Sequence, residues 1–464
     1  MVTSVMDRDR HVAILPALAV GFALVLGGGG SPAPLPEMVL QLILAGLFAS
    51  WFWSLDETSR ASVPRTAWLV MLLAVILPVI QLIPLPPALW HNLPGRELQQ
   101  EALALIGAEN SWQSWSQAPP RTLASLLAIL PVAAIIPMIA AASLPARRRV
   151  VLAVLAVAVL SMIIGAGQLS DGRGGAFRFY QPFSTFLEGF QANHNSTADL
   201  LLIGMIAVAA LIRDRIERDG LPAKPRLALV SAAGGTLLLG LGVVLTASRY
   251  GIALLPVALL AEAILLWPLL KFKLVLKPRI ALAAGAGLAG LFVIGGLAIR
   301  QNTVLAGIIG RFDFAGELRP ELWRDSIYAI RQYFPFGSGM GNFVPSLLPA
   351  ERLEVVRETM PNRAHDEFLE LAVEGGIFGL ALLGAIVVML AKAAFQSLRP
   401  HAVEGRGLRI FAIASLLVLA LHSLVDYPFR SMALASVAAA CAGLILAAGH
   451  RVRTGQSGDT EEQA

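Results

Sequence analysis

Three histidines lie where polar segments of this sequence run into apolar ones, and each has acidic or amide neighbours. They are His194 in QANHNSTADL, His365 in RAHDEFLELAVE and His422 in LHSLVDYPFR. Histidine is the side chain whose ordinary pKa lies closest to neutral, so a histidine at a water boundary suits the removal of a proton from a hydroxyl group. If the three apolar stretches end on the same side of a membrane, we expect these histidines to share one polar cavity.

Four acidic residues follow His365 and need partners if the next stretch is a membrane helix. They are Asp366, Glu367, Glu370 and Glu374. Glu370 and Glu374 are four residues apart and share one helix face. If the helix begins near Pro361 or Asn362, His365 lies in its first turn. A carboxylate in hydrocarbon costs several kcal/mol. Two interpretations stay open: pairing with arginines of the adjoining loop, which we favour, or lining of a site.

Polar residues also flank the other two histidines. Asn195 follows His194, and Asp426 lies about one helical turn after His422. We expect Asn195 and Asp426 to support the same site as the histidines. A metal centre built from His194, His365, His422 and Asp426 is a weaker alternative, because their spacing matches no metal-binding signature. The prediction is therefore a site with no metal and no cofactor.

An isolated arginine occupies the short turn TASRYG between two apolar runs. This residue is Arg249, and within residues 227–270 the only other charged residue is Glu262. A guanidinium so placed needs an anionic partner. A loop carboxylate such as Asp313 or Glu317 and a phosphate group both offer the oxygen pair that a guanidinium fork binds, so both remain open.

The elements that must position these residues are membrane spans. Apolar residues make up 56% of the 464 residues and charged residues 14%, against about 25% charged in soluble domains. Runs near the length that crosses a bilayer fall at about 12–28, 37–55, 66–85, 122–144, 149–169, 194–212, 227–247, 251–270, 280–299, 368–391, 409–424 and 431–449. We predict an all-α polytopic integral membrane protein with about twelve spans in a single membrane domain over residues 1–464. The one cysteine, Cys441, excludes an intramolecular disulfide.

The charges of the connecting loops predict the orientation of the chain. Positive residues gather in alternate loops, as in cytoplasmic loops, which places both termini in the cytoplasm. The stretches 86–121, 170–193 and 300–367 then face outward, and 300–367 is a long periplasmic loop before the tenth span. In that loop ELRPELWRDSIYAIRQYF predicts an amphipathic helix lying on the membrane, and GSGMG (337–341) is more typical of a turn than of a phosphate loop. The tail 454–464 is predicted to be a disordered cytoplasmic segment.

Four features occur in a fixed order along the C-terminal half. They are S-R-x-G with Ser248, Arg249 and Gly251; Arg319 and Trp323 followed by PFGSGMGNF; HDEFLELAVEGGIFG from His365; and H-S-x-x-D-x-P with His422, Ser423, Asp426 and Pro428. In this order they resemble the O-antigen ligase and polymerase superfamily of bacterial envelope enzymes. The N-terminal half adds the span count and the NHN stretch around His194. Asp366 stands where many relatives have asparagine, and a carboxylate there would raise the pKa of His365.

The resemblance implies a membrane glycosyltransferase of the bacterial inner membrane with its active site facing the periplasm. Such enzymes transfer a glycan from undecaprenyl diphosphate, with inversion at the anomeric carbon, to a lipid A core in ligases or to another lipid-linked glycan in polymerases. By analogy, Arg249, Arg319 and Arg324 bind the diphosphate and His365 activates the acceptor hydroxyl. The other polar residues of the cluster support these groups; they are Asp366, Glu367, Glu370, His194, Asn195, His422 and Asp426.

Three functions remain to be separated. The matched motifs concern mainly the binding of the lipid-linked donor, which ligases and polymerases share. The two activities are therefore nearly equally supported, with a preference for the ligase. A transporter is the main alternative from another class, because about twelve spans is common among transporters, but these usually bind near the midplane between repeated halves. The expected partners are the lipid-linked donor, the glycan or lipid A core acceptor and membrane lipid, with no nucleic acid.

Overall fold

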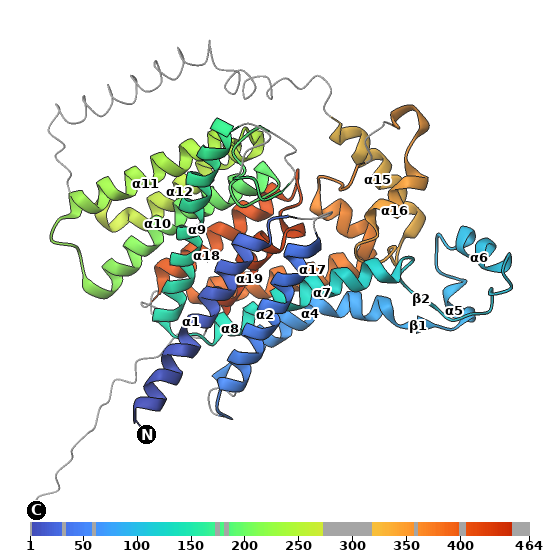
Figure 1. The fold of residues 1–464 in the computed structure, drawn as a ribbon, viewed down its shortest axis with the longest axis horizontal. Helices are drawn as coiled ribbons and strands as arrows, with labels where there is room; N and C mark the ends of the chain where they lie inside the picture. The colour runs from blue at the N-terminus through green and yellow to red at the C-terminus, as the bar shows by residue number, and fades with distance from the viewer. Residues whose placement is uncertain are drawn as a thin grey trace, which may run out of the picture.

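The chain is almost entirely α-helical. The computed structural model describes residues 2–29, 34–57, 62–171, 177–180, 185–271, 318–356, 361–398 and 405–447. Within these ranges the single sheet is a two-stranded antiparallel ribbon of β1 (Pro84–Leu85) and β2 (Gln113–Ser114). The predicted all-α membrane fold is confirmed (Figure 1).

Eleven of the twelve predicted spans coincide with described helices; the run 280–299 lies outside the described residues, as do 300–317 and the tail 454–464. The helices are α1 (Val2–Leu26), α2 (Pro34–Ser54), α4 (Arg65–Leu82), α7 (Pro119–Ala133) continued by α8 (Ile135–Ala140), α9 (Leu144–Asp171), α10 (His194–Asp219), α11 (Pro225–Leu245), α12 (Arg249–Leu270), α17 (Glu367–Ser397), α18 (Arg406–His422) and α19 (Met432–Leu446). Among the described residues, 8 helices are long and apolar enough to cross a membrane, and α1 and α19 contribute shorter apolar stretches.

The core of the helix bundle forms around α10. This helix packs against α9, α11, α12 and α18, and its residues from Asn195 to Ala207 are all buried. Helices at the rim expose large apolar side chains instead, as α11 does with Val230 and Leu237. Exposed leucine and valine over the length of a span are what a lipid-facing surface requires. The sequence therefore places its most polar span, α10, away from lipid.

Helices from the long loop cover one end of α17 (Figure 1). They are α15 (Arg319–Tyr333), α16 (Phe343–Leu347), η2 (Leu348–Ala350) and η3 (Leu353–Val355). The amphipathic helix predicted here is present as α15. It buries Leu322, Ser326 and Ala329 and packs on α17, whereas Ile327 of the same helix is 43% exposed.

A second excursion projects beside α15 and α16 (Figure 1). It contains the β1–β2 ribbon, α5 (Pro87–Trp90) and α6 (Glu97–Ala104). Trp90 is completely buried, and its indole N–H donates to the Ser111 carbonyl at 2.9 Å. This contact gives the excursion a small core of its own.

Helix α17 is broken at Gly376, where φ is 55° and ψ is −150°. The segment after α15 fills the break: Ser338 N donates to the Val373 carbonyl at 2.9 Å, and Ile377 N donates to the Pro335 carbonyl at 3.0 Å. A Cβ at position 376 would lie 2.1 Å from the Pro335 oxygen. Only glycine fits both this backbone conformation and this approach. The loop is thus joined to α17 by main-chain hydrogen bonds.

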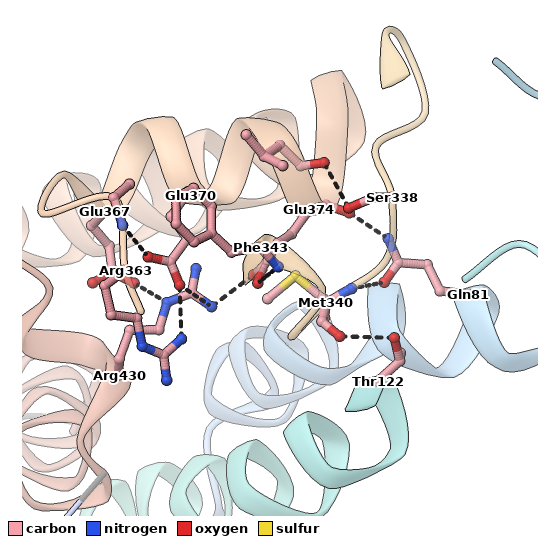
Figure 2. Close-up of polar contacts among 12 residues, drawn as sticks. Gln81, Thr122, Ser338, Met340, Phe343, Arg363, Glu367, Glu370, Glu374 and Arg430 are labelled. Carbon is pink, nitrogen blue, oxygen red and sulfur yellow. Dashed lines mark hydrogen bonds and ion pairs between the residues drawn. The ribbon is translucent and has the colours of Figure 1, made fainter. Parts of the chain in front are cut away.

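The GSGMG segment is also held by helices from the first half of the chain (Figure 2). Gly339 N donates to the Glu374 carbonyl and Met340 N to Gln81 Oε1, each at 2.9 Å, while the Thr122 hydroxyl donates to the Met340 carbonyl. These N–H groups already have acceptors, so they do not form an anion-binding loop. The turn predicted for this segment is confirmed.

Candidate active site

His365 lies in the loop just before α17. The predicted placement in the first helical turn is wrong, because Asp366 is the N-cap: its carboxylate accepts from Phe368 N and Leu369 N, both at 2.9 Å, and the helix begins at Glu367. His365 itself has φ of 49°, a left-handed conformation uncommon for any residue but glycine. The carboxylate of Asp366 therefore serves the helix end and makes no hydrogen bond to the imidazole among the described contacts.

The imidazole of His365 is held by a buried aspartate. His365 Nδ1 lies 3.1 Å from Asp426 Oδ1, with the His365 side chain 33% exposed and that of Asp426 4% exposed. Burial raises the pKa of the Asp426 carboxyl, but the hydrogen bond with His365 and the neighbouring imidazoles lower it to about 2. An ionised Asp426 accepts from Nδ1–H, which leaves Nε2 of a neutral His365 as a proton acceptor.

Asp426 contacts residues from all three of the polar segments that contain His194, His365 and His422. Its backbone N–H donates to the His422 carbonyl at 2.9 Å, Asn193 Nδ2 donates to its Oδ2 at 3.5 Å, and Asn195 hydrogen-bonds its carboxylate. Both asparagines stand at the start of α10. The expected convergence of these helix ends is present in the structure.

A second histidine–aspartate pair lies in the same region. His422 Nδ1 is 2.6 Å from Asp199 Oδ1, and both side chains are at most 1% exposed. The Nε2 atom of His422 is buried, and it has no hydrogen-bond partner among the residues that the structure describes. The His422 ring lies 6.3 Å from that of Tyr250. Asp199 was not among the predicted site residues, because nothing in its local spacing connects it with position 422.

Tyr250 is contacted by one predicted arginine and follows another in the sequence. The guanidinium of Arg319 lies over the Tyr250 ring, 5.1 Å from its centroid, and Arg249 precedes Tyr250 at the first position of α12. The cap of that helix is Ser248, whose hydroxyl accepts from Gly251 N at 3.1 Å. The S-R-x-G turn therefore caps a helix and brings the Arg249 backbone beside the residue that Arg319 contacts.

Helix α15 is attached directly to the segment that carries His365. Trp323 Nε1 donates to the Ala364 carbonyl at 3.1 Å. Tyr427 also contacts this segment: its ring centroid lies 4.9 Å from that of His365 and 6.0 Å from the guanidinium of Arg363. These contacts fix the end of α15 that bears Arg319 relative to His365.

Arg324 lies in a different place from Arg319. It lines a hollow of about 440 Å³ on the outer side of α15 together with Tyr328, Arg331 and Arg352. Five residues of helix separate the two side chains by about 140°, which explains the difference. The structure does not bring Arg324 together with Arg319, Tyr250 and His365.

The acidic residues of α17 form a buried ion-pair cluster (Figure 2). Arg430, from η4 (Pro428–Arg430), contacts three carboxylates: Glu367 at 2.8 Å, Glu370 at 3.3 Å and Glu374 at 2.7 Å. Arg363 contacts Glu370 at 2.8 Å. The interpretation in which these acids pair with loop arginines is therefore confirmed for Glu370. Arg430 is a partner that the sequence analysis missed.

His194 takes a peripheral place in this arrangement. Its ring packs edge-on against Phe186, with 5.6 Å between the ring centroids, while its neighbours Asn193 and Asn195 contact Asp426. No group of three or more histidine, cysteine, aspartate or glutamate side chains within the described ranges is placed to hold a metal ion.

The fold and these paired side chains define a polytopic, all-α membrane protein with a polar site at one end of its helices. Residues 234–384 match a family model described as O-antigen ligase, which confirms the resemblance to the O-antigen ligase-like superfamily and supports a membrane enzyme of the ligase or polymerase type. The match includes Arg249, Arg319 and His365 and ends before His422 and Asp426. No curated protein matches the chain.

Proposed function

We propose that this protein transfers a glycan from undecaprenyl diphosphate to an acceptor hydroxyl at the periplasmic face of the bacterial inner membrane. The observation that carries the proposal is the placement of His365. Its Nδ1 is bound by buried Asp426, and its segment is tied to the helix of Arg319. The arrangement places a proposed base, His365, and a proposed phosphate-binding cation, Arg319, on segments that are joined to each other.

His365 acts as the general base. Its Nε2 takes the proton of the acceptor hydroxyl as the hydroxyl oxygen attacks the anomeric carbon from the face opposite the diphosphate. The bond between that carbon and the diphosphate oxygen breaks, and its electron pair leaves with the diphosphate. The configuration at the carbon is therefore inverted. Asp426 holds the imidazole in the tautomer that this step needs and stabilises the imidazolium that forms.

Arg249 and Arg319 stabilise the leaving group. Two guanidinium groups aimed at the diphosphate match the charge that grows on it as the bond breaks, and such preorganised charge is commonly the largest contribution to catalysis. The guanidinium of Arg319 lies over the aromatic face of Tyr250, which restrains its position, and its planar fork suits a bidentate contact with a phosphate group.

The ligase is the preferred assignment, because the family model that matches is described as O-antigen ligase. Deletion of the gene in its host, followed by gel and mass analysis of envelope glycans, separates the alternatives. Loss of long glycan from lipid A, with polymer still built on its lipid carrier, identifies a ligase. Accumulation of single repeat units identifies a polymerase of lipid-linked repeat units, and unchanged glycans favour a transporter.

Point variants test the assigned residues. We expect His365→Ala to reduce transfer by about 10²-fold or more and Arg319→Ala to reduce it by about 10²- to 10³-fold, measured as glycan transferred in complemented deletion cells. Arg324→Ala is the matched control, because it removes an arginine from the same helix but from the hollow on its outer side. Equal loss in the Arg319 and Arg324 variants would contradict the separation of their roles.

A further inference from the structure

We propose that Glu370, anchored by Arg430, is a positioning residue that holds His365 in its working orientation. This inference rests on the proposed function, in which His365 is the base. It concerns a carboxylate that is completely buried in α17 and that does not touch the imidazole.

Both oxygens of Glu370 bind the two residues just before His365. Oε1 accepts from Arg363 Nη1 at 2.8 Å, and Oε2 accepts from Ala364 N at 3.1 Å. Ala364 is itself fully buried, and its carbonyl accepts from Trp323. The N–H and the carbonyl of Ala364, the residue before His365, are thus both held by side chains, the N–H by the Glu370 carboxylate and the carbonyl by the Trp323 indole.

The backbone of His365 needs such restraint. Its φ of 49° costs a residue with a Cβ about 1–3 kcal/mol and persists only where the surroundings impose it. On the far side of His365, Glu367 N donates to the Ser423 carbonyl at 2.9 Å, and Asp366 caps the helix. With Glu370 fixing positions 363 and 364, the histidine is left with one backbone conformation.

Arg430 links this restraint to the partner of the imidazole. The turn 426–430 begins with Asp426, which binds His365 Nδ1, and ends with Arg430, which contacts Glu370. The turn 426–430 therefore contacts the imidazole of His365 directly through Asp426. Through Arg430 and Glu370 it also restrains the backbone just before His365. The flanking contacts of Arg430 with Glu367 and Glu374 keep its guanidinium in place.

The test compares Glu370→Gln with Glu374→Gln. The two glutamates are matched: both are fully buried, both contact Arg430 and each accepts one backbone N–H, from Ala364 and Phe343 respectively. Only Glu370 reaches the segment before His365. We expect Glu370→Gln to lower kcat by about 10- to 100-fold with KM little changed, and Glu374→Gln to cause a smaller loss. The assay uses purified protein and the lipid-linked glycan extracted from the deletion strain.

A second measurement reports His365 without any transfer reaction. Diethyl pyrocarbonate modifies accessible neutral imidazoles, and mass analysis of the peptide gives the rate at His365 across pH 5–8. We expect Glu370→Gln to change this rate, and Glu374→Gln to match the wild type at a similar melting temperature. Equal effects of the two substitutions, or an unchanged rate in Glu370→Gln, would overturn the inference. Arg363→Gln, at a partly exposed side chain, removes one of the two contacts and replaces Glu370→Gln if that protein fails to fold.

The outcomes separate this inference from the proposed function. If His365→Ala retains transfer, the base assignment fails, while a changed labelling rate in Glu370→Gln would still show that Glu370 positions the histidine. If His365→Ala abolishes transfer and Glu370→Gln does not alter kcat or labelling, the base assignment stands and the positioning role is wrong.

Discussion

At the scale of single residues, the two histidine–aspartate pairs differ in access to solvent. His365 is one-third exposed and paired with Asp426, whereas His422 and Asp199 are almost completely enclosed. A base must reach an incoming hydroxyl group, so the difference in exposure favours His365 over His422 as the proposed base. The enclosed pair instead joins α18 to α10 beneath the residues that meet at Asp426.

The low pKa of Asp426 predicts a pH dependence of stability. Its folded-state pKa of about 2 lies below the ordinary 3.8, so the unfolded chain binds this proton more readily. The stabilisation is present above about pH 4 and is lost as the pH falls through about 2. We expect it to amount to about 2 kcal/mol, since one pKa unit corresponds to about 1.4 kcal/mol.

Unfolding of detergent-solubilised protein, followed by tryptophan fluorescence between pH 2 and pH 5, measures this effect. Between pH 5 and pH 2 the free energy of unfolding should decrease in both proteins. The decrease should be about 2 kcal/mol smaller in Asp426→Asn than in the wild type. Parallel curves for the two proteins would show that Asp426 carries no such stabilisation.

The meeting of His365, His422 and Asp426 could be predicted, because all three lie at ends of apolar runs whose parity places them on one side. Asp199 and Arg430 could not, since each is recognised only by a partner far away in the chain, and local periodicity carries no information about such pairs. The predicted start of α17, near Pro361 or Asn362, is too early in the chain. A signal for the correct start is present in the sequence, because aspartate is a preferred N-cap and Asp366 is the cap.

At the scale of elements, the break in α17 allows the segment after α15 to form main-chain hydrogen bonds with the helix. The glycines in VEGGIFG suggest packing between smooth helix faces, and a Cβ at Gly375 would indeed meet Leu77. The break at Gly376 was not predictable from these residues alone, because it depends on the segment from Pro335 that enters it.

Substitution of Gly376 tests this attachment. Gly376→Ala places a Cβ 2.1 Å from the Pro335 oxygen in a glycine conformation, and we expect a loss of about 3 kcal/mol or more. Gly384→Ala in the same helix is the control, because a Cβ there meets nothing within 4 Å; its stability should change by less than about 1 kcal/mol. Melting temperatures of the purified proteins give the comparison, and similar values would contradict a required break.

At the scale of the whole molecule, the eleven spans that fall within the described residues could be predicted from apolar run length, because bilayer thickness sets the length of a span. The packing order could not, since α10 lies at the centre and contacts α18, far away along the chain, as well as its sequence neighbours α9, α11 and α12. Orientation remains the prediction made from loop charge, with both termini in the cytoplasm and the site facing the periplasm.

Cysteine labelling tests that orientation. The single native cysteine, Cys441, is fully buried, so new cysteines report on their own positions. Leu105 is 88% exposed in the excursion after α4, and Leu221 is 46% exposed between α10 and α11. We expect a membrane-impermeant maleimide applied to intact spheroplasts to label Leu105→Cys and to reach Leu221→Cys only after lysis. The reverse pattern would invert the orientation.

The cluster around Arg430 also constrains how the protein is made. Arg430 follows Glu367 by 63 residues and Glu374 by 56. The ribosome therefore delivers these two carboxylates well before Arg430 exists, whereas Arg363, the other partner of Glu370, is made earlier. An unpaired carboxylate at bilayer depth costs several kcal/mol, which disfavours release of α17 into lipid as a separate unit. Helix α17 must therefore stay with the insertion machinery until the turn after α18 has been synthesised. A chain that ends before Arg430 lacks this counter-charge altogether, so we expect it to insert α17 poorly.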